Sequence, residues 1–158
     1  MKPDELIAAL NLHGVKYVIV GGFAAVLQGA HYITQDIDFC YARDPENLGR
    51  LVKALKPFAP VIRPNPQLGF DMNILQENAN FTLDTAVGEI DLLGYIDGLG
   101  DFLEVEKAAE VFQVHGQDYL VLSLEGLIQS KEALNRRKDI QLLEELNAIH
   151  ALRKKAVS

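Results

Sequence analysis

The chain has 158 residues, 49% of them hydrophobic, and its 15 basic and 22 acidic side chains give a net charge of -7. This length and apolar content suit one compact domain over 1–158 and are too small for two domains of ordinary size. The negative charge argues against binding to extended duplex DNA or long RNA, whereas a small ligand or a local basic patch is compatible with it.

The sequence carries no pattern typical of export or membrane insertion. Its single cysteine, Cys40, cannot form an internal disulfide, and residues 1–5 lack the features of a signal peptide. No apolar run reaches membrane-spanning length. We therefore expect a cytoplasmic protein without a membrane partner.

In the first third of the chain the hydrophobic pattern alternates between helix and strand. The pair Gly21-Gly22 separates a β-branched apolar run from a helical one. Asp44 followed by Pro45 predicts a capped helix start. The predicted elements are a helix over 3–13, a strand over 15–20, a helix over 23–28, a strand over 36–41 and a helix over 45–56.

The middle of the chain has a weaker pattern. Four prolines between residues 57 and 76 favour irregular backbone around a short strand at 60–63. Later segments alternate between β-rich runs and turns, and Ser123 is placed to cap a helix. The predicted elements are strands over 80–85 and 89–95, a loop over 97–101, a hairpin of 111–114 with 119–122, and helices over 124–134 and 138–153.

The C-terminal part of the chain, about 123–155, is predicted to be largely helical. Apolar residues recur at every third position of the last helix, which predicts a buried stripe along it. They are Ile140, Leu143, Leu146, Ile149 and Leu152.

Gly21 and Gly22 stand where the first predicted strand turns into a helix. Backbone amides at such a turn, together with the helix dipole, can hold a phosphate group that no Cβ atom obstructs. Glycine pairs also occur in turns for reasons of backbone geometry alone. The phosphate interpretation therefore depends on what lies beside this turn.

Asp36 and Asp38 lie two residues apart in the second predicted strand, so both side chains project from one face. Two carboxylates this close repel each other unless a cation lies between them. Mg²⁺ prefers one or two carboxylates together with substrate phosphates. The pair predicts a Mg²⁺ (or Mn²⁺) site completed by a nucleotide; the alternative is a solvated strand face, although Cys40 on the same face favours burial.

A third carboxylate is expected, because two-metal phosphoryl transfer usually needs one acidic group shared by both ions. Asp91 lies in an apolar strand between Ile90 and Leu92, where an unpaired charge would be costly to bury. We therefore expect Asp91 to have a partner. Glu89 points to the same face and is the rival third ligand, but its place near the strand start favours solvent exposure.

A Gly-Gly turn, an Asp-x-Asp strand and an apolar-flanked Asp together resemble the nucleotidyltransferase superfamily, typified by DNA polymerase beta and kanamycin nucleotidyltransferase. Further segments resemble small bacterial nucleotidyltransferase-like proteins, a branch that includes relatives of abortive-infection toxins. The resemblance covers roughly 5–148 and implies an α/β (α+β) fold with a mixed β-sheet flanked by helices. The matching segments are Gly21-Gly22-Phe23-Ala24-Ala25, Gly29, Thr34-Gln35-Asp36-Ile37-Asp38, Ile90-Asp91-Leu92-Leu93, Leu127-Ile128-Gln129-Ser130-Lys131 and Arg137-Lys138-Asp139.

This resemblance implies roles for the matching residues. The glycine pair would hold the triphosphate of an NTP, with Thr34 in the same nucleotide-binding group. The three aspartates would bind the divalent metal, and Asp91 would also help to activate an acceptor hydroxyl. The chain departs from many relatives at Tyr32, where they carry an Arg. Nearby His31 could replace part of that charge if protonated, although a lone loop histidine is more often a surface residue.

Lys131 and Lys138 could project from adjoining helices toward the phosphates as point charges. The alternative is that Lys131 pairs with Asp139 or Glu132 on a solvated face. For Cys40 we expect core packing, since a nucleophilic thiol would need a nearby His or cationic group.

These features predict a Mg²⁺-dependent nucleotidyltransferase that transfers a nucleoside monophosphate from an NTP to an acceptor hydroxyl. The acceptor would be a small molecule, a protein or a tRNA end. The alternative is a non-catalytic nucleotide- or metal-binding module that acts through a protein partner such as an antitoxin. Tyr32 and the lack of an obvious acceptor-binding domain motivate that alternative. A purely structural role leaves Asp91 unexplained.

Overall fold

The computed structural model of the protein describes residues 2–157, so the two ends of the predicted 1–158 domain lie outside the described residues. The helices are α1 (Pro3–Leu12), α2 (Gly21–Leu27), α3 (Pro45–Leu55), α4 (Met72–Glu77), α5 (Phe102–Lys107), α6 (Leu124–Leu134) and α7 (Ile140–Val157), with 3-10 turns η1 (Lys56–Phe58) and η2 (Arg137–Asp139). The strands are β1 (Tyr17–Val20), β2 (Asp36–Tyr41), β3 (Val61–Arg63), β4 (Phe81–Thr85), β5 (Gly88–Leu93), β6 (Ala109–Val114) and β7 (Gln117–Leu122).

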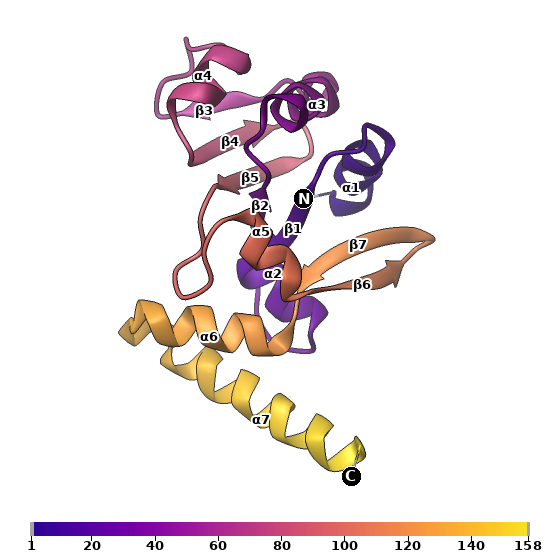
Figure 1. Cartoon of the computed structure of the whole chain (residues 1–158), viewed down its shortest axis with the longest axis vertical. Helices are drawn as coiled ribbons and strands as arrows, with labels where there is room; N and C mark the ends of the chain where they lie inside the picture. Colours follow the sequence, from indigo (N-terminus) through magenta and orange to yellow (C-terminus); the bar gives the residue numbers. More distant parts are fainter. Residues whose placement is uncertain (1, 158) are drawn as a thin grey trace.

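Within residues 2–157, seven strands form one sheet in the order β3-β4-β5-β2-β1-β7-β6. The sheet is mixed, because β2 runs antiparallel to β1 and parallel to β5. Helices flank it, and α6 and α7 follow the last strand at the C-terminal end of the chain (Figure 1). The predicted α/β fold, a mixed sheet flanked by helices with C-terminal helices, is confirmed.

One face of the central strands forms the core. Ile37 and Phe39 of β2 lie beside Ile90 and Leu92 of β5, and all four side chains are buried. Apolar residues of α1 and α3 cover this face. Because side chains alternate along a strand, Asp36, Asp38 and Asp91 project from the opposite face.

The two predicted helix caps are present. The Asp44 carboxylate accepts a hydrogen bond from the backbone N–H of Asn47 at 3.1 Å, at the start of α3. The Ser123 hydroxyl accepts one from the N–H of Gly126 at 3.1 Å, at the start of α6. Both caps satisfy backbone donors that the first helical turn leaves without a partner.

Two short helices, α4 and α5, were not predicted. They correct the prediction of irregular backbone over 57–76 and of a loop that leads directly into the hairpin after residue 101. Each begins at an aspartate cap: Asp71 accepts from the N–H of Ile74 at 3.1 Å, and Asp101 from that of Glu104 at 3.4 Å. Both helices have six residues. Such short helices are poorly detected by hydrophobic periodicity, whereas the Asp-x-x-Glu spacing at 101–104 was a usable signal.

The predicted apolar stripe of α7 is wrong in part. Leu142 and Leu146 are the buried residues of this helix, while Ile140 is 53% and Leu152 66% exposed. A step of three residues turns about 300° around a helix, so positions repeated every three residues wind around its surface.

Within the described part of the chain, no helix combines the length and apolar character needed to cross a membrane.

Candidate active site

Three aspartates meet on the face of the sheet opposite to the one that α1 and α3 cover. Asp36, Asp38 and Asp91 each offer a carboxylate oxygen, and these three oxygens lie within 4.8 Å of one another. The register explains this, because Asp38 of β2 stands directly beside Asp91 of β5, with Asp36 two residues earlier on the same face. The structure thus brings together the three aspartates that the sequence pattern singled out.

Glu89, the rival third ligand, has another partner. It stands beside Asp36 in the β2–β5 register, but the Nη1 atom of Arg63 donates a hydrogen bond to its Oε1 at 3.0 Å. Arg63 also forms an ion pair with Asp84 on the neighbouring strand. Arg63 therefore engages the two acidic residues that lie beside the aspartate cluster. Its role was missed because β3 is a three-residue strand in a proline-rich segment, where pairing is hard to predict.

The cluster contains buried oxygens without partners. Among the described residues, Oδ1 of Asp38 and Oδ1 of Asp91 are buried and have no hydrogen-bond partner. Leaving a buried carboxylate oxygen unsatisfied is costly. A divalent cation would satisfy both oxygens, and hard cations such as Mg²⁺ prefer carboxylate ligands. The donor set therefore fits such an ion.

Burial and the mutual repulsion of the three carboxylates raise the pKa values of Asp36 and Asp38. Burial raises the pKa of Asp38 to about 8, and the charge of Asp36 and the contact with Asp91 add to the rise, while Lys131 opposes it. Burial also raises the pKa of Asp36, and the neighbouring Asp91 carboxylate adds to the rise. Positive charge among the three carboxylates would remove this repulsion.

Gly21 gives the cluster its space. Its φ is +66°, a conformation that L side chains rarely adopt, and a Cβ atom there would overlap Oδ2 of Asp38. The missing side chain therefore allows the Asp38 carboxylate to lie directly against the turn between β1 and α2. This places backbone amides of the predicted phosphate-binding turn next to the carboxylates.

Gly22 lies under the ring of Tyr32. A Cβ atom at Gly22 would lie 2.6 Å from Cε1 of Tyr32 and 3.5 Å from the hydroxyl oxygen of Thr34. The Tyr32 side chain is half exposed. Where many relatives of the resembled family carry an Arg, this chain thus places an aromatic ring against the glycine turn.

Thr34 positions one of the aspartates. Its hydroxyl donates to the backbone carbonyl of Asp36 at 2.7 Å and lies 3.3 Å from Oδ1 of the same residue. His31 points elsewhere: its ring is 98% exposed, and Nδ1 lies 3.0 Å from Oε1 of Glu145 on α7. The loop thus orients Asp36 through Thr34, while His31 connects it to the C-terminal helix.

Lys131 belongs to a buried ion cluster. Its Nζ atom lies 3.4 Å from Oδ1 of Asp139, and Nε of Arg136 donates to Oδ2 at 2.6 Å. The Lys131 and Asp139 side chains are only 13% and 9% exposed. The predicted partner is correct, but the pair is not on a solvated face. Lys138, by contrast, is exposed.

The balance of charges keeps Asp139 ionised. Burial raises the pKa of this carboxyl, but the hydrogen bond from Arg136 and the charge of Lys131 outweigh burial and hold the pKa below its usual value. Arg136 was missed at first, although its spacing of three residues from Asp139 favours an ion pair. The cluster fixes Lys131, whose charge also acts on Asp38.

Cys40 continues the aspartate face of β2 but is fully buried. Burial raises the pKa of its thiol to about 12, with the charge of Asp101 adding to the rise. The thiol therefore stays protonated and packs in the core, as expected from the sequence.

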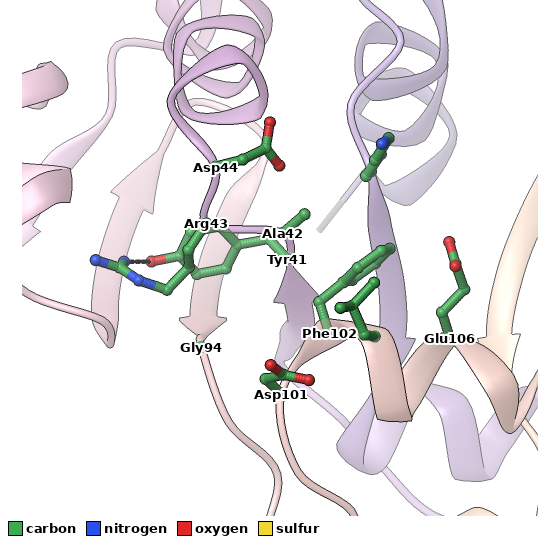
Figure 2. Close-up of a pocket in the computed structure, with 10 residues that line it drawn as sticks. Tyr41, Ala42, Arg43, Asp44, Gly94, Asp101, Phe102 and Glu106 are labelled. Atoms are coloured by element: carbon green, nitrogen blue, oxygen red, sulfur yellow. Dashed lines mark hydrogen bonds between the residues drawn. The ribbon is translucent and has the colours of Figure 1, made fainter.

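Two hollows lie near the central strands. One, of about 460 Å³, adjoins Asp91. Figure 2 shows the other, of about 470 Å³, at the C-terminal end of β2 beside Tyr41 and Phe102. There, Nη1 of Arg43 donates to the Tyr41 hydroxyl at 2.7 Å. The described residues that line this second hollow include none of the three clustered aspartates, so only the first one adjoins the cluster.

Comparisons with known proteins support the fold. No protein-family model and no curated protein matches the chain. A Thermotoga maritima protein described as a candidate nucleotidyltransferase has a similar structure, with a TM-score of 0.61 and 19% identity over 90% of this chain and 88% of that one.

Two enzymes with bound antibiotics are also similar. The lincosamide antibiotic adenylyltransferase LnuA, solved with lincomycin, gives a TM-score of 0.61 and 16% identity over 94% of this chain and 98% of that one. ANT(2")-Ia, solved with adenylyl-2"-tobramycin, gives a TM-score of 0.57 and 14% identity over 99% of this chain and 97% of that one. The likeness establishes that the chain has the nucleotidyltransferase fold, as the sequence resemblance implied.

Proposed function

We propose that this nucleotidyltransferase fold carries a working transfer site, in which Asp36, Asp38 and Asp91 hold Mg²⁺ (or Mn²⁺) and the turn at Gly21 and Gly22 receives the phosphates of an NTP. The observation that carries the proposal is the pair of buried, unpartnered oxygens on Asp38 and Asp91 beside that turn. A cation bound between them would offset the cost of burying these oxygens in their ionised form.

When bound, the divalent ion would supply positive charge that neutralises the phosphate oxygens and the charge that develops on them. The chain's own groups supply the rest. The backbone amides of the turn would donate to the triphosphate, and Lys131 would add a fixed positive charge near Asp38. Thr34 would hold Asp36 in its orientation.

The transfer itself forms one bond and breaks one. The oxygen of an acceptor hydroxyl attacks the α-phosphorus, the bond from that phosphorus to the bridging oxygen breaks, and pyrophosphate leaves. Asp91 would accept the proton of the acceptor hydroxyl, because it is the member of the cluster that also borders an open hollow. The nucleoside monophosphate is then joined to the acceptor.

A small-molecule acceptor is favoured over a protein or a tRNA end. LnuA is solved with lincomycin and ANT(2")-Ia with an adenylylated tobramycin, both small molecules. The net charge of -7 also disfavours a nucleic-acid acceptor. We therefore propose adenylyl or related transfer to a small hydroxylated molecule.

The test uses each labelled NTP in turn with Mg²⁺, measuring binding by calorimetry and turnover by pyrophosphate release. We expect binding of at least one NTP by the wild type and none by Asp38→Asn, with the exposed loop variant Asp97→Asn behaving like the wild type. If no NTP binds, or if Asp38→Asn binds as well as the wild type, the proposal fails. Binding without pyrophosphate release across acceptors would instead favour the non-catalytic module acting through a partner such as an antitoxin.

A further inference from the structure

The hollow beside Asp91 has a volume of about 460 Å³ and is formed by β3, β4, β5 and the segment 64–80. Asp91 belongs both to its lining and to the aspartate cluster. A molecule in this hollow would therefore lie next to the proposed transfer site. Small-ligand sites typically enclose about 300 to 1,000 Å³, whereas a stable protein interface covers roughly 800 Å² on each partner. The size suits a small molecule.

The uncharged polar groups of the lining are mostly amides. Asn65, Asn78 and Asn80 border the hollow together with Thr82. Within residues 2–157 the side-chain amides of Asn65 and Asn78 have no hydrogen-bond partner, and Asn80 uses only its oxygen, which accepts from the N–H of Gly94 at 3.0 Å. Amides and hydroxyls both donate and accept, so they match the hydroxyls of a polyol.

The remaining lining is apolar or charged. Apolar side chains such as Leu68, Ile74 and Leu93 border the hollow. Its charged lining consists of Arg63 and Asp91 among the described residues. The Arg63 guanidinium is engaged by Glu89 and Asp84, and Asp91 is one of the three aspartates proposed to hold the divalent ion. With that ion bound, a charged ligand would meet no free opposite charge in this lining.

We propose that this hollow receives the acceptor and that the acceptor is a neutral, hydroxyl-bearing small molecule with an apolar part, such as a glycoside, rather than a polycation or an acid. The assignment as acceptor rests on the proposed function. The preference for a neutral ligand rests on the lining together with a divalent ion at Asp91 and is read from binding, so it can be tested separately from transfer.

Three glycosides of 4-nitrophenol provide matched probes: the β-glucoside is neutral, the β-glucosaminide carries an amine and the β-glucuronide carries a carboxylate. Dissociation constants are measured by NMR on the side-chain amide signals of Asn65, Asn78 and Asn80, with and without Mg²⁺ and a non-hydrolysable ATP analogue. With Mg²⁺ and the ATP analogue bound, we expect the glucoside to bind at least about tenfold more tightly than either charged probe, because an unpaired charge in this lining is penalised. Equal or tighter binding of a charged probe under these conditions, or no shift of these signals, would overturn the preference.

A charge placed in the lining should reverse the preference. We expect Asn78→Asp to raise affinity for the glucosaminide by about tenfold, since the new carboxylate would pair with the amine. Asn73→Asp is the matched control, because it adds the same charge on α4 at an exposed residue outside the lining. If both variants change the affinity equally, the effect belongs to overall charge and the assigned lining is wrong.

The acceptor role has its own readout. With ATP and Mg²⁺, mass spectrometry should find the glucoside carrying one added adenylyl group. If the nucleotide binds but the glucoside neither binds nor reacts, the inference fails while the proposed function stands. If no nucleotide binds but the glucoside still shifts the asparagine signals selectively, the proposed function fails and the neutral binding site stands.

Discussion

A Cβ atom on Gly21 would lie 2.9 Å from Cγ of Asp38 and closer still to its Oδ2. The carboxylate therefore occupies the space that any other residue at position 21 would need. The same glycine has a positive φ of +66°, so its replacement is opposed by backbone strain as well as by contact.

We predict that Gly21→Ala loses divalent-metal binding. The backbone strain should cost about 1–2 kcal/mol of the free energy of unfolding. Displacement of Asp38 should lower Mn²⁺ affinity by at least about tenfold, as for other changes that misplace a metal ligand. Gly14→Ala is the control, because Gly14 has a φ of +67° and nothing near its added Cβ. Calorimetric titration should show normal Mn²⁺ binding for Gly14→Ala; equal losses in both variants would contradict the overlap with Asp38.

Gly22→Ala should act through Tyr32. The added methyl group would collide with the ring, but the ring is half exposed and can move, and Gly22 has no strained φ. We expect a loss of about 1 kcal/mol in chemical unfolding, and a smaller loss when Tyr32→Ala is already present, since neighbouring changes couple by about 0.5 to 3 kcal/mol. Gly49→Ala in the helix α3, where nothing lies near the added Cβ, should instead stabilise by up to about 1 kcal/mol. Additive effects of Gly22→Ala and Tyr32→Ala would argue against their contact.

Asp91 and Glu89 should differ sharply as third ligand. We expect Asp91→Asn to lower Mn²⁺ affinity by at least about tenfold, and Glu89→Gln to have little effect, since Glu89 is already paired with Arg63. Without metal, Asp91→Asn should raise the Tm, because one of three mutually repelling carboxylates is gone. Mn²⁺ titrations and thermal melts of both variants measure this. The reverse order of metal affinities would make Glu89 the ligand.

Stability without metal should fall as the pH rises. Burial, followed by the charge of Asp36, raises the pKa of Asp38 from 3.8 to about 8 in the folded protein. Between these values the native state binds more protons than the unfolded state, so the free energy of unfolding decreases with rising pH. We expect the Tm of the wild type to fall across this window more steeply than that of Asp38→Asn, with Asp97→Asn following the wild type.

Mg²⁺ should counteract this loss. The carboxylates bind a metal only when they are deprotonated, so the rise in Tm on adding Mg²⁺ should grow with pH across the same window and level off above about pH 8. Melting curves at roughly pH 5 to 9, with and without Mg²⁺, measure both effects, because this range includes the shifted pKa of Asp38 and part of the window below it. A pH-independent effect of Mg²⁺ would mean that the ion binds elsewhere.

Lys131→Ala should weaken both the fold and nucleotide binding. Asp139 would keep Arg136 but lose a charged partner at a site only 9% exposed, which should cost about 1–3 kcal/mol in unfolding. Lys131→Arg should retain much of the stability, and the exposed Lys138→Ala should change it by less than about 0.5 kcal/mol. If Lys138→Ala lowers NTP affinity as much as Lys131→Ala, the assignment of the phosphate-facing cation is wrong.

Much of the site could be predicted because its information is local. The alternation that puts Asp36 and Asp38 on one face follows from two-residue periodicity, and Asp91 was conspicuous as a charge in an apolar strand. The caps of α3 and α6 were predictable for the same reason. The roles of these aspartates in metal binding and catalysis stay predictions until they are tested.

The features of the site that could not be predicted depend on contacts between segments that are distant in the sequence. The pairing of Arg63 with Glu89, the burial of Lys131 against Asp139 and the position of Tyr32 over Gly22 all require the tertiary structure. Helices of six residues were not predicted because they are shorter than two turns. The α7 stripe was wrong in part because a period of three departs from the helical repeat.

The in-register pairing of β2 with β5 has a consequence for how the protein tolerates change. A slip of one residue in this pairing would turn the acidic side chains of β2 or β5 toward the hydrophobic core and expose the isoleucine of that strand to water. A slip of one residue is therefore penalised twice. Selection for a dry interior would thus preserve the two-residue spacing of these acidic positions independently of any bound ligand.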